Sequence, residues 1–373
     1  MKLKTCLANL TVANLNLQLN RIQGILNYLN THKIDALVVT KLPNVRYLSG
    51  FSGSAGYLVL AQKAKYFVSD FRYKIQASRE INKSLRVKID KQGSFDFIRE
   101  ISEKYGLKRI GFESGAMVYS QVQILKKVLK GKKLVPVDGL IEQFTTVKTN
   151  DEIDNIRYAV KITDKVFSKL LAFIKPGITE TDIAAELTYL QIKGGASGNS
   201  FSPIVASGEN SAFPHAQPTN RKLKSGDLLT LDFGCIYNGF CSDMTRTIGI
   251  GKLSAEAKKI YQIVSDAQQL AINSIAKNKS TKVVDSVARN YIHSKGYGKY
   301  FGHGLGHGLG IEVHENPRLN QISNSILTEG NVVTVEPGIY IENFGGVRIE
   351  DDVIVTEDGC EVLNSSPKEL III

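Results

Sequence analysis

Glycine occupies every even position from 302 to 310 in the segment GHGLGHGLGIEVHE, which also holds three of the chain's six histidines. A helix through this segment would cost about 1 kcal/mol for each glycine relative to alanine, roughly 4–5 kcal/mol in total. That cost excludes a zinc helix carrying His303 and His307, and the HExxH zinc motif is absent because Arg318 stands at its second histidine position. We therefore expect an extended segment, with the glycines on one face and the histidines on the other.

The same segment does not match a phosphate-binding loop. Its glycines have the spacing G-x-G-x-G, no Lys-Ser or Lys-Thr pair comes after them, and no helical pattern begins afterwards. In an extended chain, His303 and His307 would lie about 13 Å apart, too far to bind one ion together. We expect at most one of them to bind a metal directly, unless the segment bends sharply.

The length and charge of the chain indicate two domains. With 373 residues, each of two domains can bury a core. Residues 1–150 carry 25 Lys and Arg against 10 Asp and Glu, whereas the remaining residues carry 22 against 26. The lysines are scattered apart from KKVLKGKK at 126–133, so we expect a solvated basic surface and no nucleic-acid partner. No apolar run approaches the ~20 residues that span a bilayer, so we expect no membrane segment.

The cysteines do not form a disulfide framework. Cys6, Cys235, Cys241 and Cys360 are widely spaced and include no CxxC pair. Asn and Gln side chains also interrupt the first twenty residues, which therefore lack an apolar stretch of signal-peptide type. We expect reduced thiols and a cytoplasmic protein.

Short apolar stretches alternate with helical patterns in the first part of the chain. Helical patterns such as FDFIREISEKYG and SQVQILKKVLKG lie between several apolar stretches, and this alternation indicates an α/β layer with a largely parallel sheet. The predicted strands lie at 34–40, 57–61, 65–69, 85–89, 109–114 and 133–137.

A domain boundary is predicted close to residue 148. A capping box from Thr149 to Glu152 precedes apolar residues at helical spacing, and Pro176-Gly177 ends that pattern. The boundary separates an α/β domain at 1–145 from a second domain at 146–373 that we expect to be α+β. The second domain is predicted to have helices at 182–193 and 254–295, with strand-rich sequence beginning at about residue 201.

Two aspartates are brought together by a predicted β-hairpin at 228–250. Its turn is Asn238-Gly239, which suits a type I′ turn because both central residues need φ > 0. The resulting register places Asp232 and Asp243 on the same face as diagonal neighbours. Two like charges side by side in an apolar sheet are costly unless a cation lies between them, so this pair favours a metal site. The same register puts Cys235 and Cys241 on opposite faces, which argues against a disulfide between them.

Two glutamates occur in similar apolar surroundings. Glu336 comes directly after the run NVVTV, and Glu350 lies within GGVRIEDDVIVT, which we predict to be one strand after a glycine-rich turn. The flanking Val and Ile residues indicate burial, where an unpaired charge is not tolerated.

These segments together resemble a known enzyme family. In chain order, LDFG, SDMTRT, GHGLGHGLG with VHE, TVEPGIY and GGVRIEDD resemble the five-ligand signature of the pita-bread metallopeptidases. That family includes aminopeptidase P, prolidase, methionine aminopeptidase and the non-peptidase creatinase. The resemblance covers the whole chain, because residues 1–145, with SDFRYKIQA at 69–77, are similar to the creatinase-type amino-terminal domain. It implies an α/β creatinase-like domain followed by an α+β pita-bread catalytic domain.

The resemblance implies a set of metal ligands. By this correspondence Asp232 binds one metal, Asp243 and Glu350 bridge two metals, and His307 and Glu336 complete the second site. Four carboxylates and one imidazole suit Mn²⁺ or Co²⁺, with Zn²⁺ or Fe²⁺ as alternatives. A water between two metals loses a proton near neutral pH and becomes a nucleophile, and Glu336 is the implied proton acceptor and donor.

The resemblance also implies substrate-contacting residues. His215 and His314 are expected to hold the amino end and the carbonyl or intermediate, and His303 the proline side of the scissile bond. Arg348, two residues before Glu350, is expected to orient that carboxylate or to bind substrate.

Within the family, methionine aminopeptidases differ from this chain. They lack the large amino-terminal domain, the additional histidine found here as His303, and the arginine found here as Arg348. The segments SDFRY and VASGENSAFPHAQPT are closer to aminopeptidase P, so we predict removal of the residue before a proline from the amino end of peptides. Two alternatives remain, a prolidase that cleaves only Xaa-Pro dipeptides, and an inactive binding module whose basic first domain holds an acidic partner. The resemblance further implies a homodimer.

Overall fold

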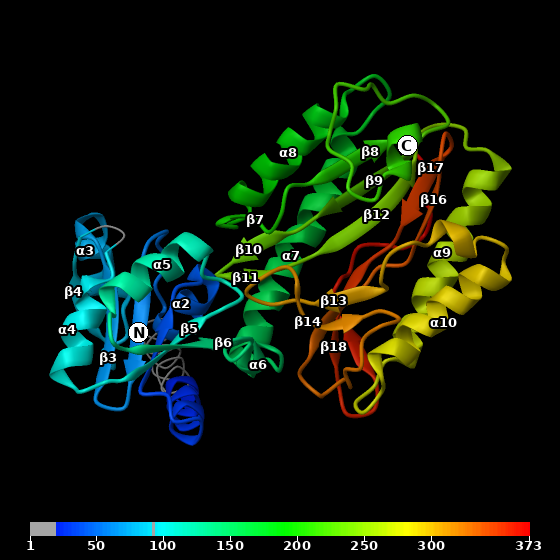
Figure 1. Ribbon diagram of the computed structural model, residues 1–373. Helices are drawn as coiled ribbons and strands as arrows, with labels where there is room; N and C mark the ends of the chain where they lie inside the picture. The colour runs from blue at the N-terminus through cyan, green and yellow to red at the C-terminus, as the bar shows by residue number, and fades with distance from the viewer. Residues whose placement is uncertain (1–19, 92–93) are drawn as a thin grey trace, which may run out of the picture. The chain divides into compact units, whose positions relative to one another are not determined.

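The structure is a computed structural model that describes residues 20–91 and 94–373. The chain divides into two compact units, the first ending at Phe144 and the second beginning at Thr145 (Figure 1). No helix in the described ranges is both long enough and apolar enough to cross a membrane. Cys6 lies outside these ranges, and the other three cysteines are free thiols.

The first unit contains a six-stranded sheet whose strand order is β4-β3-β2-β1-β5-β6. The pairs β1–β5, β5–β6 and β3–β4 are parallel, as predicted, but β2 runs antiparallel to both β1 and β3. Only Gln62 and Lys63 connect β2 to β3, and so short a connection cannot cross over to a parallel strand. The strands are β1 Ala36–Val39, β2 Tyr57–Ala61, β3 Ala64–Ser69, β4 Arg86–Ile89, β5 Arg109–Glu113 and β6 Lys133–Val137.

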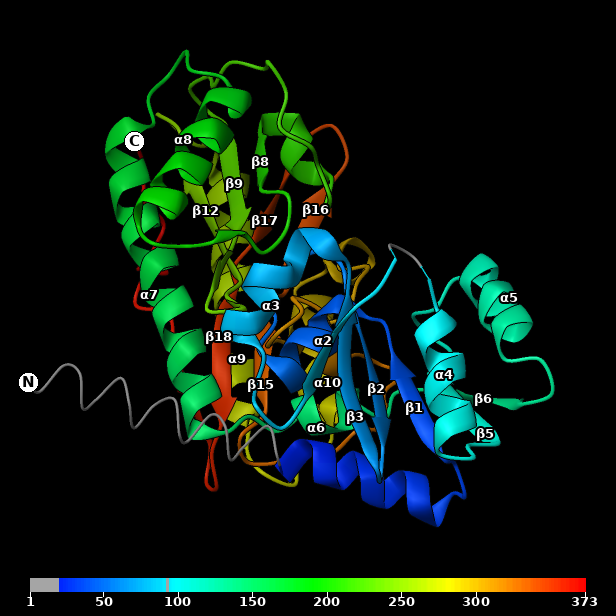
Figure 2. The same cartoon turned by 90° about the vertical axis from the view of Figure 1, so that its left-hand side faces the viewer.

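Helices cover both faces of this sheet. As a result, β1 and β2 are buried along their whole length. Figure 2 shows α4 and α5 together on one side of the strands. Their side chains pack on alternate residues of the central strands, including Ala36, Val38 and Val59. Residues 20–31 are also helical. The remaining helices are α2 Leu42–Ser49, α3 Lys74–Glu80, α4 Asp96–Lys104, α5 Tyr119–Val128 and, at the end of the unit, α6 Glu142–Thr145.

Four helices of the second unit flank its sheets, α7 and α8 on one side and α9 and α10 on the other (Figure 1). The first begins as predicted, with the backbone N–H of Thr149 donating to the Glu152 carboxylate at 2.8 Å. The helical stretch predicted at 254–295 is instead two helices, because the polar segment between them turns through Asn278 at a φ of 66°. The helices are α7 Asn150–Phe173, α8 Glu180–Lys193, α9 Ala255–Ser274 and α10 Thr281–Ser294.

The strands of the second unit form four small sheets, with orders β12-β9-β8, β14-β13-β15-β18-β19, β11-β10-β7 and β16-β17. Their apolar side chains form one core with α9 and α10 and another with α7 and α8. The strands are β7 Gly198–Asn199, β8 Ile204–Ser207, β9 Leu228–Phe233, β10 Cys235–Tyr237, β11 Phe240–Cys241, β12 Met244–Gly249, β13 Gly306–Gly308, β14 Glu315–Leu319, β15 Val332–Val335, β16 Gly338–Ile341, β17 Gly345–Arg348, β18 Asp351–Val355 and β19 Cys360–Val362.

The hairpin predicted at 228–250 has the expected register, with Thr245 opposite Asp232. Asn238 and Gly239 both have positive φ, 49° and 87°, as a type I′ turn requires. The register is continuous across the turn, so the local sequence alone places the two aspartates of this hairpin.

Within the glycine-rich segment, only Gly306–Gly308 form a strand, β13, which lies between β14 and β15. A Cβ at Gly306 would lie 2.0 Å from the carbonyl oxygen of Thr334, and one at Gly308 would lie 2.2 Å from that of Asn316. These glycines therefore allow the neighbouring backbone to approach more closely than any side chain would permit.

Candidate metal centre

Acidic side chains and one histidine from distant parts of the second unit meet in one pocket of about 420 Å³. They come from β9, the residue before β12, β13, the residue after β15 and the residue before β18. All the predicted metal ligands line this pocket, namely Asp232, Asp243, His307, Glu336 and Glu350.

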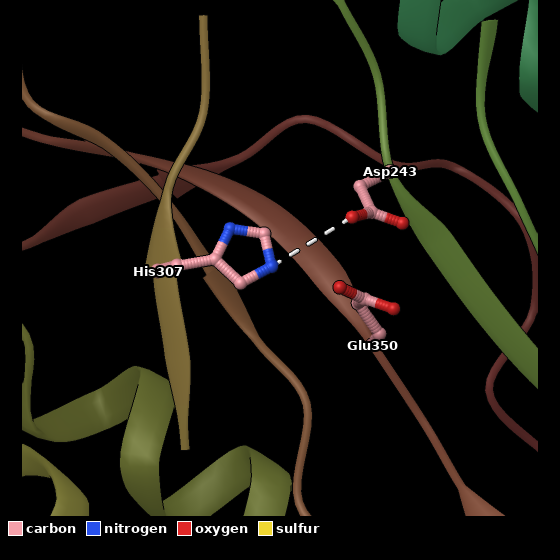
Figure 3. Close-up of side chains that lie close together, drawn as sticks. All are labelled: Asp243, His307 and Glu350. Atoms are coloured by element: carbon pink, nitrogen blue, oxygen red, sulfur yellow. Dashed lines mark ion pairs between the residues drawn. The ribbon is translucent and has the colours of Figure 1, made fainter. Parts of the chain in front are cut away.

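The tightest group within the pocket is Asp243, His307 and Glu350. One potential ligand atom from each lies within 4.8 Å of the others, and Figure 3 shows the three side chains directed toward a common point. His307 Nε2 lies 3.8 Å from Asp243 Oδ2 and 3.3 Å from the Oε1 atom of Glu336. Three carboxylates thus surround the ring of one histidine, whose Nδ1 atom lies 3.1 Å from the Gly308 carbonyl oxygen.

The two glutamates enter the pocket where a strand is interrupted. The predicted single strand around Glu350 is divided into β17 and β18, and the Glu350 N–H donates to the Thr245 carbonyl at 3.1 Å. Glu336 similarly lies between β15 and β16, and its N–H donates to Leu305 O at 2.8 Å. At each interruption the chain passes from one sheet to another. Glu336 then lies beside His307, and Glu350 lies beside Asp243 and His307.

The pocket concentrates negative charge that the protein does not fully compensate. Burial raises the pKa of Asp243 well above its ordinary value, and the neighbouring carboxylates of Glu350 and Asp232 raise it further. Burial likewise raises the pKa of Glu350, with the Glu336 and Asp232 carboxylates adding to the effect. Asp232 and Asp243 each retain one buried carboxylate oxygen without a hydrogen-bond partner. Buried acids of this kind fit divalent cations, which would supply the missing positive charge.

Glu336 differs from the other acids in its electrostatic surroundings. Burial opposes its ionisation, but the hydrogen bond and charge of His307, with the charges of His303 and Arg348, lower its pKa to about 2. Glu336 is therefore a carboxylate at neutral pH and accepts a hydrogen bond from Thr334 Oγ1 at 3.3 Å. Glu336 is therefore the pocket acid that the protein's own histidines and Arg348 hold in its ionised form.

Arg348 contacts a different acid from the one predicted. Its side chain is 4% exposed, and its guanidinium pairs directly with Asp232, not with Glu350. It also donates to the Thr245 hydroxyl at 3.1 Å, and that hydroxyl donates to Glu350 at 2.6 Å. Arg348 therefore reaches Glu350 only through Thr245, whose position opposite Asp232 agrees with the predicted hairpin.

Tyr340 contacts two pocket residues and was not predicted from the sequence. Its hydroxyl accepts a hydrogen bond from Arg348 at 2.7 Å and lies 2.9 Å from His303 Nε2. The signal was available, since Tyr340 and Arg348 are diagonal neighbours in a short hairpin.

The three histidines predicted to contact substrate all line the pocket, but with different exposure. His303 is half-buried, and burial lowers its pKa. His314 is exposed with its ring 4.4 Å from that of His307, and desolvation together with the charges of His307 and Arg318 lowers its pKa to about 4. His215 is exposed at the rim. The segment thus brings both His303 and His307 to one pocket, while only His307 belongs to the tightest acidic group.

The pocket also has apolar lining residues and a cation that were not predicted from the sequence. The apolar side chains are Phe201, Ile204 and Val313. Arg318, opposite His307 in the β13–β14 register, is exposed and lines the pocket. Within residues 20–91 and 94–373, no carboxylate forms an ion pair with Arg318. Apolar side chains in one pocket with such a cation suit a small ligand that has an apolar group and a carboxylate.

Comparisons with known proteins agree with this geometry. Residues 154–357 match the model of metallopeptidase family M24, and residues 21–145 match the creatinase/prolidase N-terminal domain. A Xaa-Pro dipeptidase from Pyrococcus horikoshii is 37% identical, over 94% of this chain and 98% of its own length.

Solved structures give the same result. The Xaa-Pro dipeptidase from Bacillus anthracis has 40% identity and a TM-score of 0.92, covering 95% of this chain and 100% of its own. The X-Pro aminopeptidase from Thermotoga maritima has 36% identity and a TM-score of 0.85, covering 91% of this chain and 98% of its own.

Proposed function

This chain belongs to metallopeptidase family M24, and from that membership we propose that it is a metal-dependent hydrolase of the bond before proline, acting first of all on Xaa-Pro dipeptides. One observation carries the proposal. The acidic pocket that fits divalent cations also contains Arg318, whose charge would match the terminal carboxylate of a short substrate. The two segments whose resemblance favoured an aminopeptidase, SDFRY and VASGENSAFPHAQPT, do not contain this arginine.

Two divalent cations would be held by the five residues predicted from the sequence, Asp232, Asp243, His307, Glu336 and Glu350. Their oxygen-rich donor set with a single imidazole favours Mn²⁺, with Co²⁺, Zn²⁺ and Fe²⁺ as the alternatives for metal analysis to separate. When bound, the cations would polarise the scissile carbonyl and lower the pKa of attacking water.

The protein's own side chains would bind the peptide and move its protons. We assign Glu336 as the group that accepts the proton of the attacking water and returns it to the leaving proline nitrogen, because its carboxylate lines the pocket beside His307, where that water would be bound. His314, exposed beside His307, would hold the carbonyl oxygen, and His215 at the rim would hold the amino end. His303 would contact the proline side, fixed through Tyr340.

Arg348 takes a positioning role in this proposal. Its burial and its direct pairing with Asp232 favour that role over contact with substrate. Through Thr245 it also fixes the orientation of Glu350, so two proposed ligands depend on one guanidinium.

An Xaa-Pro aminopeptidase is the second candidate function, favoured by the similarity to the Thermotoga maritima X-Pro aminopeptidase. The two functions differ in the group attached to the carbonyl end of the proline. A dipeptide ends there in a carboxylate that would pair with Arg318, whereas a longer peptide continues with a neutral amide.

The test is turnover of matched peptides by protein loaded with Mn²⁺. We expect hydrolysis of Xaa-Pro dipeptides, much slower hydrolysis of Xaa-Pro-Yaa tripeptides with the same first residue, and none of Xaa-Ala dipeptides. Faster cleavage of the tripeptides would replace the dipeptidase by the aminopeptidase. No cleavage of either with any of the four metals would overturn the proposed function.

A further inference from the structure

Two ion pairs contact residues 301–312, a stretch that includes most of the glycine-rich segment, one near each end of the stretch. Three of the four side chains are at most 6% exposed, and Arg289 is 17% exposed. Both pairs come from outside the pocket, and neither contributes a side chain to it. Their hydrogen bonds reach the backbone of the stretch beside the residues that carry pocket histidines. Such contacts matter here because glycine backbone has no side chains to pack and depends on its neighbours for a fixed position.

The upstream pair is formed by Asp285 and Arg289, one turn apart on α10, with 2.7 Å between Arg289 Nη2 and Asp285 Oδ1. The Asp285 side chain is completely buried. Arg289 donates to the carbonyl oxygens of Phe301 at 3.0 Å and His303 at 2.7 Å. Asp285 Oδ1 accepts the N–H of Leu305 at 3.1 Å. The pair therefore holds the backbone on both sides of His303.

The downstream pair is formed by Lys148, just before α7, and Glu315, at the start of β14. Nζ and Oε2 lie 2.9 Å apart, and the side chains are 2% and 6% exposed. The other carboxylate oxygen, Oε1, accepts the N–H groups of Ile311 at 2.8 Å and Glu312 at 3.1 Å. The carboxylate thus closes the turn that ends in His314, the residue directly before Glu315.

We propose that these ion pairs are positioning devices for the two pocket histidines, Asp285–Arg289 for His303 and Lys148–Glu315 for His314. The inference rests on the proposed function, in which both histidines contact the peptide. Each pair combines a full charge with several backbone hydrogen bonds, an arrangement that locks a peptide segment more tightly than neutral contacts would. The charge is compensated inside each pair, so neither pair requires the metals.

Double-mutant cycles test whether each pair acts through its own histidine. We expect Glu315→Gln alone to lower kcat/KM for an Xaa-Pro dipeptide by about 10–100-fold, the range for residues that orient a catalytic group. The same change should cost less than about twofold when His314→Ala is already present, but its full factor in the presence of His303→Ala. Asp285→Asn should cost less than about twofold when His303→Ala is already present, but its full factor in the presence of His314→Ala. Additive losses in all four combinations would overturn the proposal.

A stability control separates positioning from general damage. Asp227→Asn breaks the ion pair between Arg221 and Asp227 in the same unit, and neither of these side chains forms a hydrogen bond or ion pair with residues 301–312. It should lower the melting temperature and leave kcat/KM unchanged. Should Asp285→Asn not fold, Arg289→Lys keeps the charge but removes the forked donors, and it must then show the same dependence on His303 for the proposal to stand.

A second readout does not depend on activity. In metal-free protein labelled with ¹³C-histidine, Glu315→Gln should shift the ring resonance of His314 more than that of His303, and Asp285→Asn should do the opposite. If wild-type protein cleaves no Xaa-Pro peptide, the proposed function fails while these shifts still decide the positioning role. Equal shifts of both histidines in both variants would overturn that role.

Discussion

Glu350 and Asp351 are adjacent, equally buried acids whose surroundings differ completely. The Asp351 carboxylate lies 2.7 Å from Arg246 Nη2 and 2.9 Å from Lys368 Nζ, and it accepts a hydrogen bond from Gln268 at 2.8 Å. Glu350 faces the pocket with the Thr245 hydroxyl and other carboxylates as its neighbours. One residue along the chain therefore separates a compensated acid from an uncompensated one.

The pKa directions agree with this difference. Burial raises the pKa of Asp351, but the charges of Arg246 and Lys368 outweigh burial and hold it below its ordinary value. Burial raises the pKa of Glu350, and nothing in its surroundings outweighs it. The protein supplies its own cations for Asp351. Glu350 has no Arg or Lys partner within ion-pair distance in the described residues, so its cation is left to come from solution.

The largest expected effect comes from removing an uncompensated acid. Asp243→Asn should abolish the binding of at least one of the proposed cations and lower kcat/KM by at least ~1000-fold, since bound cations would supply several kcal/mol of transition-state stabilisation. The metal-free variant should be no less stable than wild type, because the substitution removes a buried charge. Metal content by mass spectrometry and hydrolysis of an Xaa-Pro dipeptide are the measurements. Retained hydrolysis by the variant would contradict the assignment of Asp243. If wild type shows no hydrolysis, and the variant still binds an acidic partner as wild type does, the binding module would be favoured.

The opposite result is expected for the compensated acid. Asp351→Asn leaves the fully buried Arg246 guanidinium short of its partner, so the free energy of unfolding should fall by about 3–4 kcal/mol. Folded variant should still bind metal with wild-type stoichiometry. Urea unfolding measures the loss, and Glu361→Gln, which breaks an exposed ion pair with Arg157, is the control and should cost less than about 1 kcal/mol. Loss of metal binding without loss of stability would remove the distinction between the two acids.

Arg318 extends the comparison to a cation that lines the pocket. If the Arg318 guanidinium pairs with the terminal carboxylate of a dipeptide substrate, Arg318→Met should raise the KM for Xaa-Pro dipeptides about tenfold, equivalent to about 1.4 kcal/mol. The KM for a dipeptide amide, which lacks that charge, should change little, and kcat should stay close to wild type for both. Equal KM changes for acid and amide would show that Arg318 does not recognise the carboxylate.

Local patterns predicted the parts of the site that depend on short-range geometry. The turn at Asn238-Gly239 was enough to place Asp232 and Asp243 on one face, because a two-residue turn determines the register of both strands. The six strands of the first unit were also predicted within two residues, since apolar alternation and turn residues mark their ends.

Features that depend on distant segments were not predicted. The apolar pattern around Glu350 continues without a break, so only the passage between two sheets reveals that the strand is interrupted there. The contact of Lys148 with Glu315 joins residues 167 apart in the chain, and no periodicity records such a pairing. The interruption between α9 and α10 is different, because the polar stretch AKNKS was visible in the sequence and the helical pattern on both sides concealed it.

The smallest expected effect is a pH dependence that has opposite signs for the two kinds of acid. In metal-free protein the raised pKa values of Asp243 and Glu350 mean that the folded state binds more protons than the unfolded state above the ordinary carboxyl pKa. The free energy of unfolding should therefore fall as pH rises above the ordinary carboxyl range of about 4–5. Asp351, whose pKa is lowered, contributes stability throughout those higher pH values and loses it only as pH falls below about 4.

Metal should reverse the slope, because Mn²⁺ binds the deprotonated carboxylates and its stabilisation grows with pH. Urea unfolding at several pH values, with and without Mn²⁺, measures both slopes. Other titrating groups contribute to each slope, so the decisive comparison is with Asp243→Asn combined with Glu350→Gln. That double variant should flatten the metal-free slope and abolish the reversal, whereas Asp351→Asn should leave both intact. A metal-free slope that the double variant does not change would mean that the pocket acids are compensated after all, and that the contrast between Glu350 and Asp351 has another origin.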